Sequence, residues 1–129
     1  MASALKQLGK GKIYTIELAK PKIEMAGKYF KKAKVREYIS QLEGEISKLL
    51  IKWNKKIDFV FMDADKINYL SYIKEIEPFL NKRAIIVADN AINFTDLMKD
   101  YLHYVKTSEK YFSYLIPLDN GLMVSVKLE

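Results

Sequence analysis

Short runs rich in β-branched and aromatic residues alternate with amphipathic stretches along almost the whole chain of 129 residues. This alternation predicts crossover units around a mostly parallel sheet, because each helix carries the chain back to a strand beside the previous one. The last two strand-like runs are instead joined by Asn120-Gly121, a pair that tolerates the positive φ of a tight antiparallel hairpin. We therefore predict an α/β fold with helices on both faces of the sheet and an antiparallel hairpin at the C-terminus.

The predicted elements follow one another without a repeat, a low-complexity tract or a linker, so residues 1–129 are predicted to form a single domain. The predicted strands cover residues 12–18, 37–44, 56–64, 84–90, 111–118 and 122–128. The predicted helices cover residues 21–34, 45–53, 67–80 and 94–107. The runs 56–64 and 84–90 each contain a continuous apolar stretch, which is typical of strands that are buried on both faces.

Composition excludes some classes of protein. The excess of 22 Lys and Arg over 16 Asp and Glu gives a net charge of +6, but the lysines are scattered and form no basic tract with interleaved aromatic residues. Nucleic acid is therefore not predicted as a partner. The absence of cysteine excludes disulfides and thiolate metal sites, and it fits a reducing compartment. Neither a membrane-spanning run nor a signal peptide is found, so we predict a soluble, cytoplasmic protein.

Polar side chains follow three of the predicted strands at the point where each strand ends. Glu17 ends the first, Asp63 and Asp65 follow the third, and Asp89 and Asn90 follow the fourth. In an open parallel sheet, ligands bind beyond the carboxyl ends of the strands, so these residues are candidates for a site. Because side chains two apart on a strand share a face, we expect Asp63 and Asp65 to point into one crevice while Ala64 packs away.

We expect Asp63, Asp89 and Asn90 to converge, and two carboxylates with an amide oxygen suit Mg²⁺ or Ca²⁺. Lys66 is expected one turn beyond them. Near a divalent cation its pKa is expected to fall, which would allow it to act as a base. Asp and Asn are also common turn formers and helix caps, and a lone lysine is usually solvated, so the residues by themselves leave a structural role open.

Four stretches resemble, in this order, the cation-dependent O-methyltransferases of the catechol and caffeoyl-coenzyme-A type: YTIEL, FVFMDADKINYL, IIVADN and LIPLDNGLMVS. The resemblance spans almost the whole chain. It implies a class I methyltransferase fold, which is Rossmann-like, with S-adenosylmethionine as the methyl donor. It also implies a divalent cation (Mg²⁺, Ca²⁺ or Mn²⁺) and a small hydroxyl-bearing acceptor, either catechol-like or linked to coenzyme A.

The resemblance also assigns an expected role to each matched residue. The implied cofactor-binding positions are Glu17, Gly44, Glu45, Ile46, Asp63 and Asp65. Glu17 is expected to accept hydrogen bonds from the ribose hydroxyls, the three residues that start at Gly44 to lie along the adenine ring, and Asp65 to lie near the amino-acid end. The implied metal ligands are Asp63, Asp89 and Asn90, and the implied catalytic residue is Lys66.

The chain also departs from the family's pattern. The strand and glycine-rich loop with which the family's cofactor domain begins have no counterpart, so the resemblance implies an N-terminally truncated domain. The strands at 12–18 and 56–64 are then expected either to pair directly or to leave backbone groups unpaired, and such an edge favours a homodimer. A second hypothesis is a methyltransferase-like remnant that acts as an assembly or binding module, and a third is an RNA-associated relative whose binding falls steeply with salt.

Overall fold

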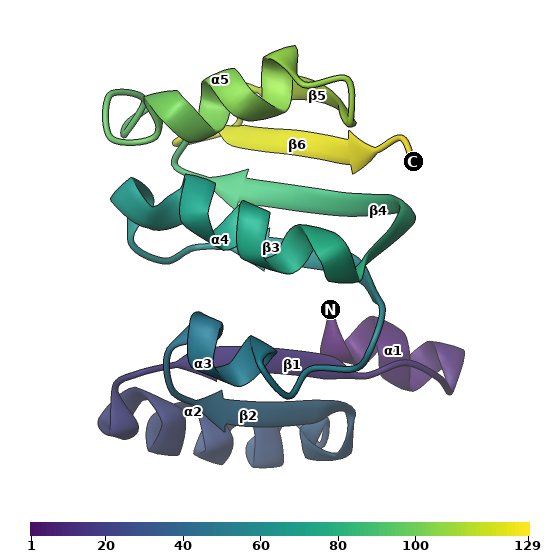
Figure 1. The fold of residues 1–129 in the computed structure, drawn as a ribbon. Helices are drawn as coiled ribbons and strands as arrows, with labels where there is room; N and C mark the ends of the chain where they lie inside the picture. The colour runs from purple at the N-terminus through teal and green to yellow at the C-terminus, as the bar shows by residue number, and fades with distance from the viewer. The chain divides into compact units, whose positions relative to one another are not determined.

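The computed structural model describes all of residues 1–129, which form two compact units, residues 1–53 and residues 54–129 (Figure 1). Each unit has its own sheet, and the predicted alternation of strands and helices is found in both. The α/β class and the C-terminal antiparallel hairpin are thereby confirmed. The prediction of a single domain stays a prediction.

The first unit consists of a two-stranded parallel sheet with its helices. Its elements are α1 (Ala2–Leu8), β1 (Ile13–Glu17), α2 (Lys20–Lys32), the 3-10 turn Arg36–Tyr38, β2 (Ile39–Glu43) and α3 (Ile46–Leu50). Pro21 lies in the first turn of α2, where its missing N–H costs no hydrogen bond. Val35 and Ile39 are the only side chains of this unit that are buried, so its core is small.

The second unit contains a four-stranded sheet in the order β3-β4-β6-β5. Its elements are β3 (Ile57–Met62), α4 (Tyr69–Ile76) between the 3-10 turns Lys66–Asn68 and Glu77–Phe79, β4 (Leu80–Asp89), α5 (Lys99–Thr107), β5 (Tyr111–Ile116) and β6 (Leu122–Lys127). β3 and β4 are parallel, whereas β6 is antiparallel to both β4 and β5. None of the helices in the chain has both the length and the apolar content that crossing a bilayer would require.

Several predicted boundaries in this unit differ from the structure. β3 ends at Met62, two residues earlier than predicted, and β4 begins at Leu80 and not at residue 84. Helix α5 begins at Lys99 and not at residue 94. Turns precede it, and the Thr95 hydroxyl donates to the carbonyl oxygens of Ala91 (2.9 Å) and Ile92 (2.8 Å). Such side-chain bonds to the backbone compete with helix formation and delay the helix start.

The core of the second unit lies between the sheet and its two helices, which Figure 1 shows on the same side of the sheet. Tyr69 of α4 and Tyr101 of α5 pack edge-on with their ring centres 5.6 Å apart. Ile86 of β4 and Met123 of β6 point into this layer and are fully buried. The hydroxyl of Ser113 on β5 donates to the carbonyl of Val105 on α5.

One partly buried carboxylate, Glu77, ties the helices of this unit to its last strands. Its Oε1 atom accepts hydrogen bonds from the hydroxyls of Tyr104 (2.7 Å) and Tyr111 (2.8 Å), and its Oε2 atom pairs with Lys110 Nζ (2.6 Å). Burial raises the pKa of Glu77, but the hydrogen bonds from Lys110, Tyr104 and Tyr111 together outweigh it and lower the pKa below its usual value. Glu77 is therefore held as a carboxylate.

The opposite side of the four-stranded sheet is apolar and carries neither helix of its unit. We call it the open face; it is made of Phe59, Phe61, Ile85, Val87, Phe112, Tyr114, Ile116, Leu122, Val124 and Val126. The exposed fraction reaches 63% at Phe112 and 52% at Tyr114 on β5, and 49% at Phe61 on β3. The sequence predicts strands covered on both faces, whereas the helices of this unit cover only one.

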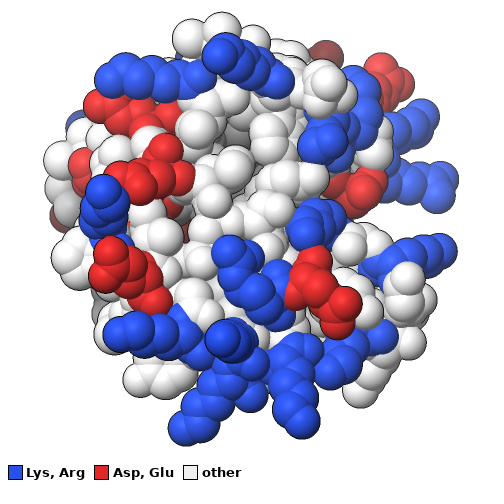
Figure 2. All heavy atoms as spheres, turned by 90° about the horizontal axis from the view of Figure 1, so that it is seen from below, with Lys and Arg blue, Asp and Glu red and all other residues white.

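Strands β1 and β3 are both edge strands, since β1 pairs only with β2 and β3 pairs only with β4. Within its own unit each of these strands thus has one unpaired side, and the two predicted outcomes for the pair stay predictions. Charge also differs between the units: residues 1–53 contain twelve of the 22 Lys and Arg but five of the 16 Asp and Glu. On the face that Figure 2 shows, basic side chains gather along the lower and right-hand parts and the rim, with a smaller number of acidic side chains between them.

Candidate functional site

The carboxyl ends of β3 and β4 bring two of the predicted metal ligands to one edge of the sheet. Met62 is in register with Ala88, so Asp63 and Asp89, the next residue after each, lie at the same edge of the sheet. Met62 and Ala88 point into the core. Because side chains alternate along a strand, Asp89 points to the other side of the sheet. Asp63 is exposed at this edge, with 55% of its side-chain surface accessible.

Asn90, the third predicted ligand, is held by the hairpin turn. Its φ of 66° is left-handed, a conformation that Asn tolerates, and its N–H donates to Asp89 Oδ1 (2.7 Å). The next two residues donate backbone hydrogen bonds to the turn, Ala91 to Gly121 and Ile92 to Asn120, both at 2.9 Å. The sequence indicated Asn120-Gly121 only as a hairpin turn, and its support of the Asn90 loop was missed.

Lys66 forms an ion pair with Asp63 inside the predicted site. The distance from Lys66 Nζ to Asp63 Oδ1 is 2.8 Å, and Nζ also donates to the hydroxyl of Tyr69 at 3.0 Å. The Tyr69 hydroxyl in turn donates to the carbonyl of Met62 (2.9 Å) and is thereby anchored to the end of β3. Only 12% of the Lys66 side chain is exposed. Tyr69 follows the polar cluster directly in the sequence, but its anchoring role was not predicted.

The electrostatics around Lys66 differ from the sequence-based expectation. Burial lowers the pKa of Lys66, but the hydrogen bonds to Asp63 and Tyr69 outweigh it and raise the pKa above its usual value. The expected fall depends on a nearby cation, and in this arrangement the carboxylate of Asp63 stabilises the ammonium form instead. Lys66 is therefore a charged donor here, not a base.

Asp65 does not lie beside Asp63 on a strand, so the expectation of a shared strand face is wrong. β3 ends at Met62, and Asp65 occupies the residue before the 3-10 turn Lys66–Asn68. Its Oδ2 atom accepts a hydrogen bond from Asn68 Nδ2 (2.9 Å). This contact ties Asp65 to the loop, and the residue is otherwise exposed.

Glu17, the predicted ribose ligand, lies at the end of β1 in the first unit. Its Oε1 atom accepts hydrogen bonds from the backbone N–H groups of Ala19 (2.9 Å) and Leu18 (2.8 Å), and Oε2 lies 4.0 Å from Lys22 Nζ. The hydrogen bond from Ala19 is the main cause that lowers the pKa of Glu17. The carboxylate is therefore ionised and oriented, with Oε2 free to accept a further hydrogen bond. It lines a small cavity of about 150 Å³ with Lys22, Ile23 and Gln41.

The predicted adenine residues follow the end of the neighbouring strand β2, where Glu17 and Glu43 are in register. Gly44 has a φ of 141°, which favours glycine, and its N–H donates to the carbonyl of Glu17 (3.2 Å). Glu45 precedes α3 and forms an exposed ion pair with Lys48 (2.8 Å), and Ile46 begins the helix. The structure thus groups these residues with Glu17, while the other predicted site residues belong to the second unit.

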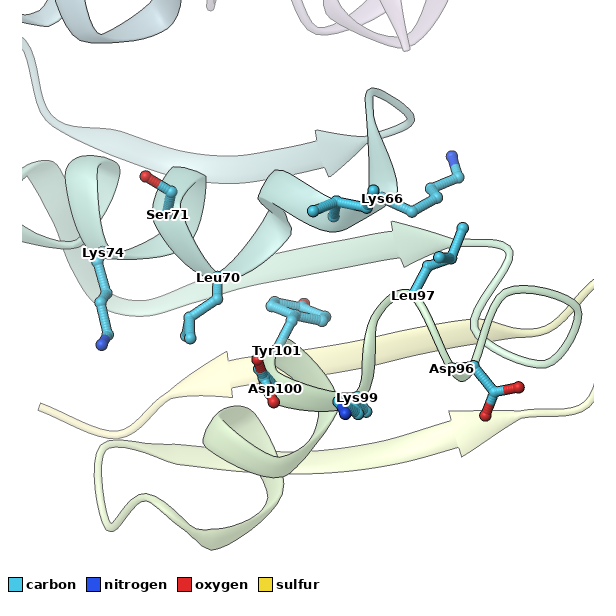
Figure 3. Close-up of a pocket in the computed structure, with 10 residues that line it drawn as sticks. Lys66, Leu70, Ser71, Lys74, Asp96, Leu97, Lys99, Asp100 and Tyr101 are labelled. Carbon is cyan, nitrogen blue, oxygen red and sulfur yellow. The ribbon is translucent and has the colours of Figure 1, made fainter.

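A groove of about 520 Å³ lies between α4 and α5, and Lys66 stands at one end of it (Figure 3). Apolar side chains, including Leu70 and Leu97, form part of its wall. Its charged residues are Lys66, Lys74, Lys99, Asp96 and Asp100. The sequence analysis missed this groove, although Leu70 and Lys74 are four residues apart and so share one side of α4.

The donor set at the ends of β3 and β4 fits a hard divalent cation. No group of three or more His, Cys, Asp or Glu side chains is placed to hold a metal, but the predicted set needs only two carboxylates and the amide of Asn90. Carboxylate and amide oxygens suit Mg²⁺ and Ca²⁺. Asp63 already attracts one cation, the Lys66 ammonium group, which shows that positive charge is stabilised at this point.

The similarity of this chain to known proteins extends over almost its full length. The family model described as O-methyltransferase matches residues 1–125. A caffeoyl-CoA O-methyltransferase of Medicago sativa is 30% identical over 136 residues, which cover 100% of this chain and 55% of that protein. The chain thus spans about half the length of this relative.

Two solved structures have the same fold. The SAH-bound methyltransferase PaMTH1 of Podospora anserina superposes with a TM-score of 0.80 at 21% identity, covering 92% of this chain and 61% of its own. The O-methyltransferase TomG of Streptomyces achromogenes, in complex with SAM, also gives 0.80, at 18% identity, covering 92% of this chain and 63% of its own.

Proposed function

Because the chain belongs to the O-methyltransferase family, we propose that it takes part in transferring a methyl group from S-adenosylmethionine to a hydroxyl of a small acceptor. The observation that carries this proposal is that each unit places polar side chains at its strand ends, the first unit at the end of β1 and the second at the neighbouring ends of β3 and β4. One presents the oriented carboxylate of Glu17, and the other presents Asp63, Lys66, Asp89 and Asn90. The relative TomG is described in complex with SAM, which supports this choice of donor.

In this proposal Glu17 Oε2 accepts hydrogen bonds from the ribose hydroxyls of the donor, since Oε1 is already held by two backbone N–H groups. Gly44, Glu45 and Ile46 border the adenine ring. Asp65, with Asp63, lies toward the charged amino-acid end of the donor. A carboxylate that is fixed before the ligand arrives loses little conformational entropy on binding, which favours affinity.

Asp63, Asp89 and Asn90 are the residues that would hold Mg²⁺, or Ca²⁺ or Mn²⁺ in its place. A bound cation lowers the pKa of a coordinated hydroxyl and fixes its direction. Asp63 would then exchange its Lys66 partner for the cation. The loss of this ion pair would remove the contact that raises the pKa of Lys66, so that Nζ could release its proton to solvent and, as a neutral amine, accept the proton that leaves the acceptor hydroxyl.

The transfer itself breaks the bond between the donor sulfur and its methyl carbon and forms a bond between that carbon and the acceptor oxygen. It requires the acceptor oxygen to lie in line with the breaking bond. The groove between α4 and α5 begins at Lys66 and is the proposed position of the acceptor. Its apolar side chains would pack against the body of a small hydroxyl-bearing molecule.

A cytoplasmic location is part of the same proposal. It is supported by the absence of cysteine, which fits a reducing compartment.

Calorimetric titration of the chain with S-adenosylmethionine, with and without Mg²⁺, tests the binding half of this proposal. We expect binding that Mg²⁺ and an acceptor strengthen, and about tenfold weaker binding in Glu17→Ala because hydrogen bonds to a charged group are lost. Glu24→Ala, an exposed carboxylate on α2, is the matched control and should bind normally. Equal affinities of the two variants would reject the ribose role of Glu17.

Transfer of a labelled methyl group to a catechol tests the chemical half. Asp63→Ala and Asp89→Ala should abolish metal-dependent transfer with the fold intact, whereas Asp58→Ala at the start of β3 should retain it. Lys66→Ala should lower the rate more than the donor affinity. Equal loss of rate and affinity would contradict the assigned role of Lys66.

The alternative function is a methyltransferase-like assembly or binding module without catalysis. The observation that favours it is the open face, an apolar surface with several half-exposed aromatic side chains. The same titration separates the two functions, because a module of this kind predicts no heat on addition of S-adenosylmethionine.

A further inference from the structure

We propose that the first unit binds single-stranded nucleic acid at the end of its sheet where β1 and β2 begin. A cluster of six basic side chains, which we call the basic end, lies there: Lys6, Lys12, Lys31, Lys32, Lys34 and Arg36. The sequence analysis treated the lysines as scattered, because the contribution of Lys6 and Lys12 depends on the fold. Glu17 lies at the other end of β1, so the basic end is separate from the proposed donor site.

Hydrogen bonds to backbone carbonyls hold three of these side chains in place. Lys6 Nζ donates to the carbonyl oxygen of Lys34 (3.0 Å), and Lys12 Nζ donates to that of Glu37 (2.6 Å). The guanidinium group of Arg36 donates to the carbonyl oxygen three residues further along the chain (2.7 Å). Each group keeps further N–H donors, since an ammonium group has three and a guanidinium group has five. These cations are therefore oriented before a ligand arrives, which favours affinity.

The basic end is not neutralised by carboxylates. The ion pairs of the first unit join Lys22 to Glu17 and Lys48 to Glu45, and neither includes a residue of the basic end. Figure 1 shows α1 at the opposite end of this sheet from the arrowheads of β1 and β2, where three of the five Glu residues of the unit lie. Only Glu37 lies among the six cations, all of which are exposed. Their mutual repulsion would be relieved by a bound polyanion.

An exposed aromatic side chain lies beside these cations. Tyr29 is 63% exposed and lies one helical turn from Lys32 on α2, and Met25, which is 55% exposed, lies one turn to the other side. Bases stack on exposed rings of this kind, and the bases of a single strand are available for stacking whereas those of a duplex are paired. The basic end and Tyr29 together provide the two features of single-strand binding, cations for the phosphates and a ring for the bases.

Other anionic partners use fewer of these features. A helix that binds a bilayer inserts its apolar side. In α2 that side contains Ile23 and Phe30, which are half-buried where the helix packs on the sheet of its unit. An acidic protein would use the charges but not the exposed ring of Tyr29. Nucleic acid uses both, and the observations therefore favour it.

Fluorescence anisotropy of a labelled single-stranded oligouridine, titrated with the full chain, tests this proposal. We expect a dissociation constant on the order of 10 μM near 100 mM salt and weaker binding to a duplex of the same length. If about four of the six cations contact phosphates, the logarithm of the binding constant should fall with the logarithm of the salt concentration with a slope of about −3. A slope near zero would overturn the proposal, and so would equal affinity for polyglutamate or for phosphatidylserine vesicles.

Paired charge reversals separate the basic end from the net charge of the chain. Lys31→Glu combined with Lys32→Glu should weaken binding about tenfold or more. Lys20→Glu combined with Lys52→Glu is the matched control, because it changes the net charge equally but lies outside the basic end, and it should weaken binding less than about threefold. Circular dichroism of both double variants reports whether each is folded. Equal weakening by the two pairs would show that only net charge matters and would overturn the proposal.

Tyr29 gives a measurement that does not depend on charge. Tyr29→Ala should weaken binding about fivefold, whereas Tyr29→Phe keeps the ring and should bind as the unmodified chain does. Because the Tyr29 side chain is mostly exposed, both variants should keep the fold. Equal affinities of Tyr29→Ala and Tyr29→Phe would reject stacking, and with it the choice of nucleic acid as the partner.

Discussion

The two units of this chain have the same kinds of elements but differ in how they are stabilised. Residues 1–53 bury two side chains, whereas residues 54–129 bury the remaining apolar core, including Tyr69, Ile86 and Met123. Local stability follows buried apolar contacts, so opening of the first unit should cost less free energy than opening of the second. The predicted site residues of the first unit, such as Glu17, are therefore held by a less stable framework than those of the second unit, such as Asp63.

The largest expected effect comes from deleting core volume in the second unit. Ile86→Ala removes a fully buried side chain from β4 and should cost about 3 kcal/mol of unfolding free energy, since the cavity is not refilled. Ile16→Ala in β1, where the side chain is 39% exposed, should cost less than about 1 kcal/mol. Urea unfolding combined with amide hydrogen exchange of both strands measures the two costs. Equal costs would show that the first unit is as tightly packed as the second.

The second largest effect on stability is expected at Glu77, whose carboxylate joins the helices of the second unit to its last strands. Its pKa is lowered in the folded chain, so its contribution to stability is complete above its unfolded pKa and is lost as the pH falls through the lower folded value. Glu77→Gln should cost about 2 kcal/mol at neutral pH because it removes charge-assisted hydrogen bonds. The difference in unfolding free energy between Glu77→Gln and the unmodified chain should become smaller at acid pH. Urea unfolding at several pH values measures it, and a pH-independent difference would contradict this account.

Two glycines with positive φ give the next comparison. Gly121 (φ +84°) lies against Ile92, whose backbone nitrogen would be 2.8 Å from an added Cβ, whereas Gly9 (φ +68°) in the first unit has nothing within 4 Å. Gly9→Ala should cost only the ~1 kcal/mol of left-handed strain. Gly121→Ala should cost about 2 kcal/mol and also speed amide exchange at Ala91 and Ile92. If both substitutions cost the same, the turn does not support the Asn90 loop.

The smallest expected effect is at the tyrosine that anchors Lys66. Tyr69→Phe removes the hydroxyl that joins Lys66 to the Met62 carbonyl and should cost about 1 kcal/mol. Tyr14→Phe in the first unit keeps the edge-on packing against Trp53 and should change stability by less than about 0.5 kcal/mol. Thermal unfolding of both variants gives the comparison. If Tyr69→Phe leaves the stability unchanged, the hydroxyl does not stabilise this part of the site.

Much of the fold could be predicted because its signals are local. The alternation of strand-like and helical segments, Pro21 at a helix start and Asn120-Gly121 in a hairpin all depend on neighbouring residues. Boundaries were less predictable. β3 was expected to include Asp63, but the chain turns after Met62, and the start of α5 was displaced by the hydrogen bonds of Thr95.

For the candidate site, the sequence determined which side chains follow which strands, since position along the chain is enough for that. Tertiary structure decided what those side chains do. It paired Lys66 with Asp63 and raised its pKa, and it braced the Asn90 loop with Gly121. It also placed both helices of the second unit on the same face of the four-stranded sheet, so that neither covers the other face. These outcomes depend on strand register and on contacts between residues distant in the sequence, which no local pattern encodes.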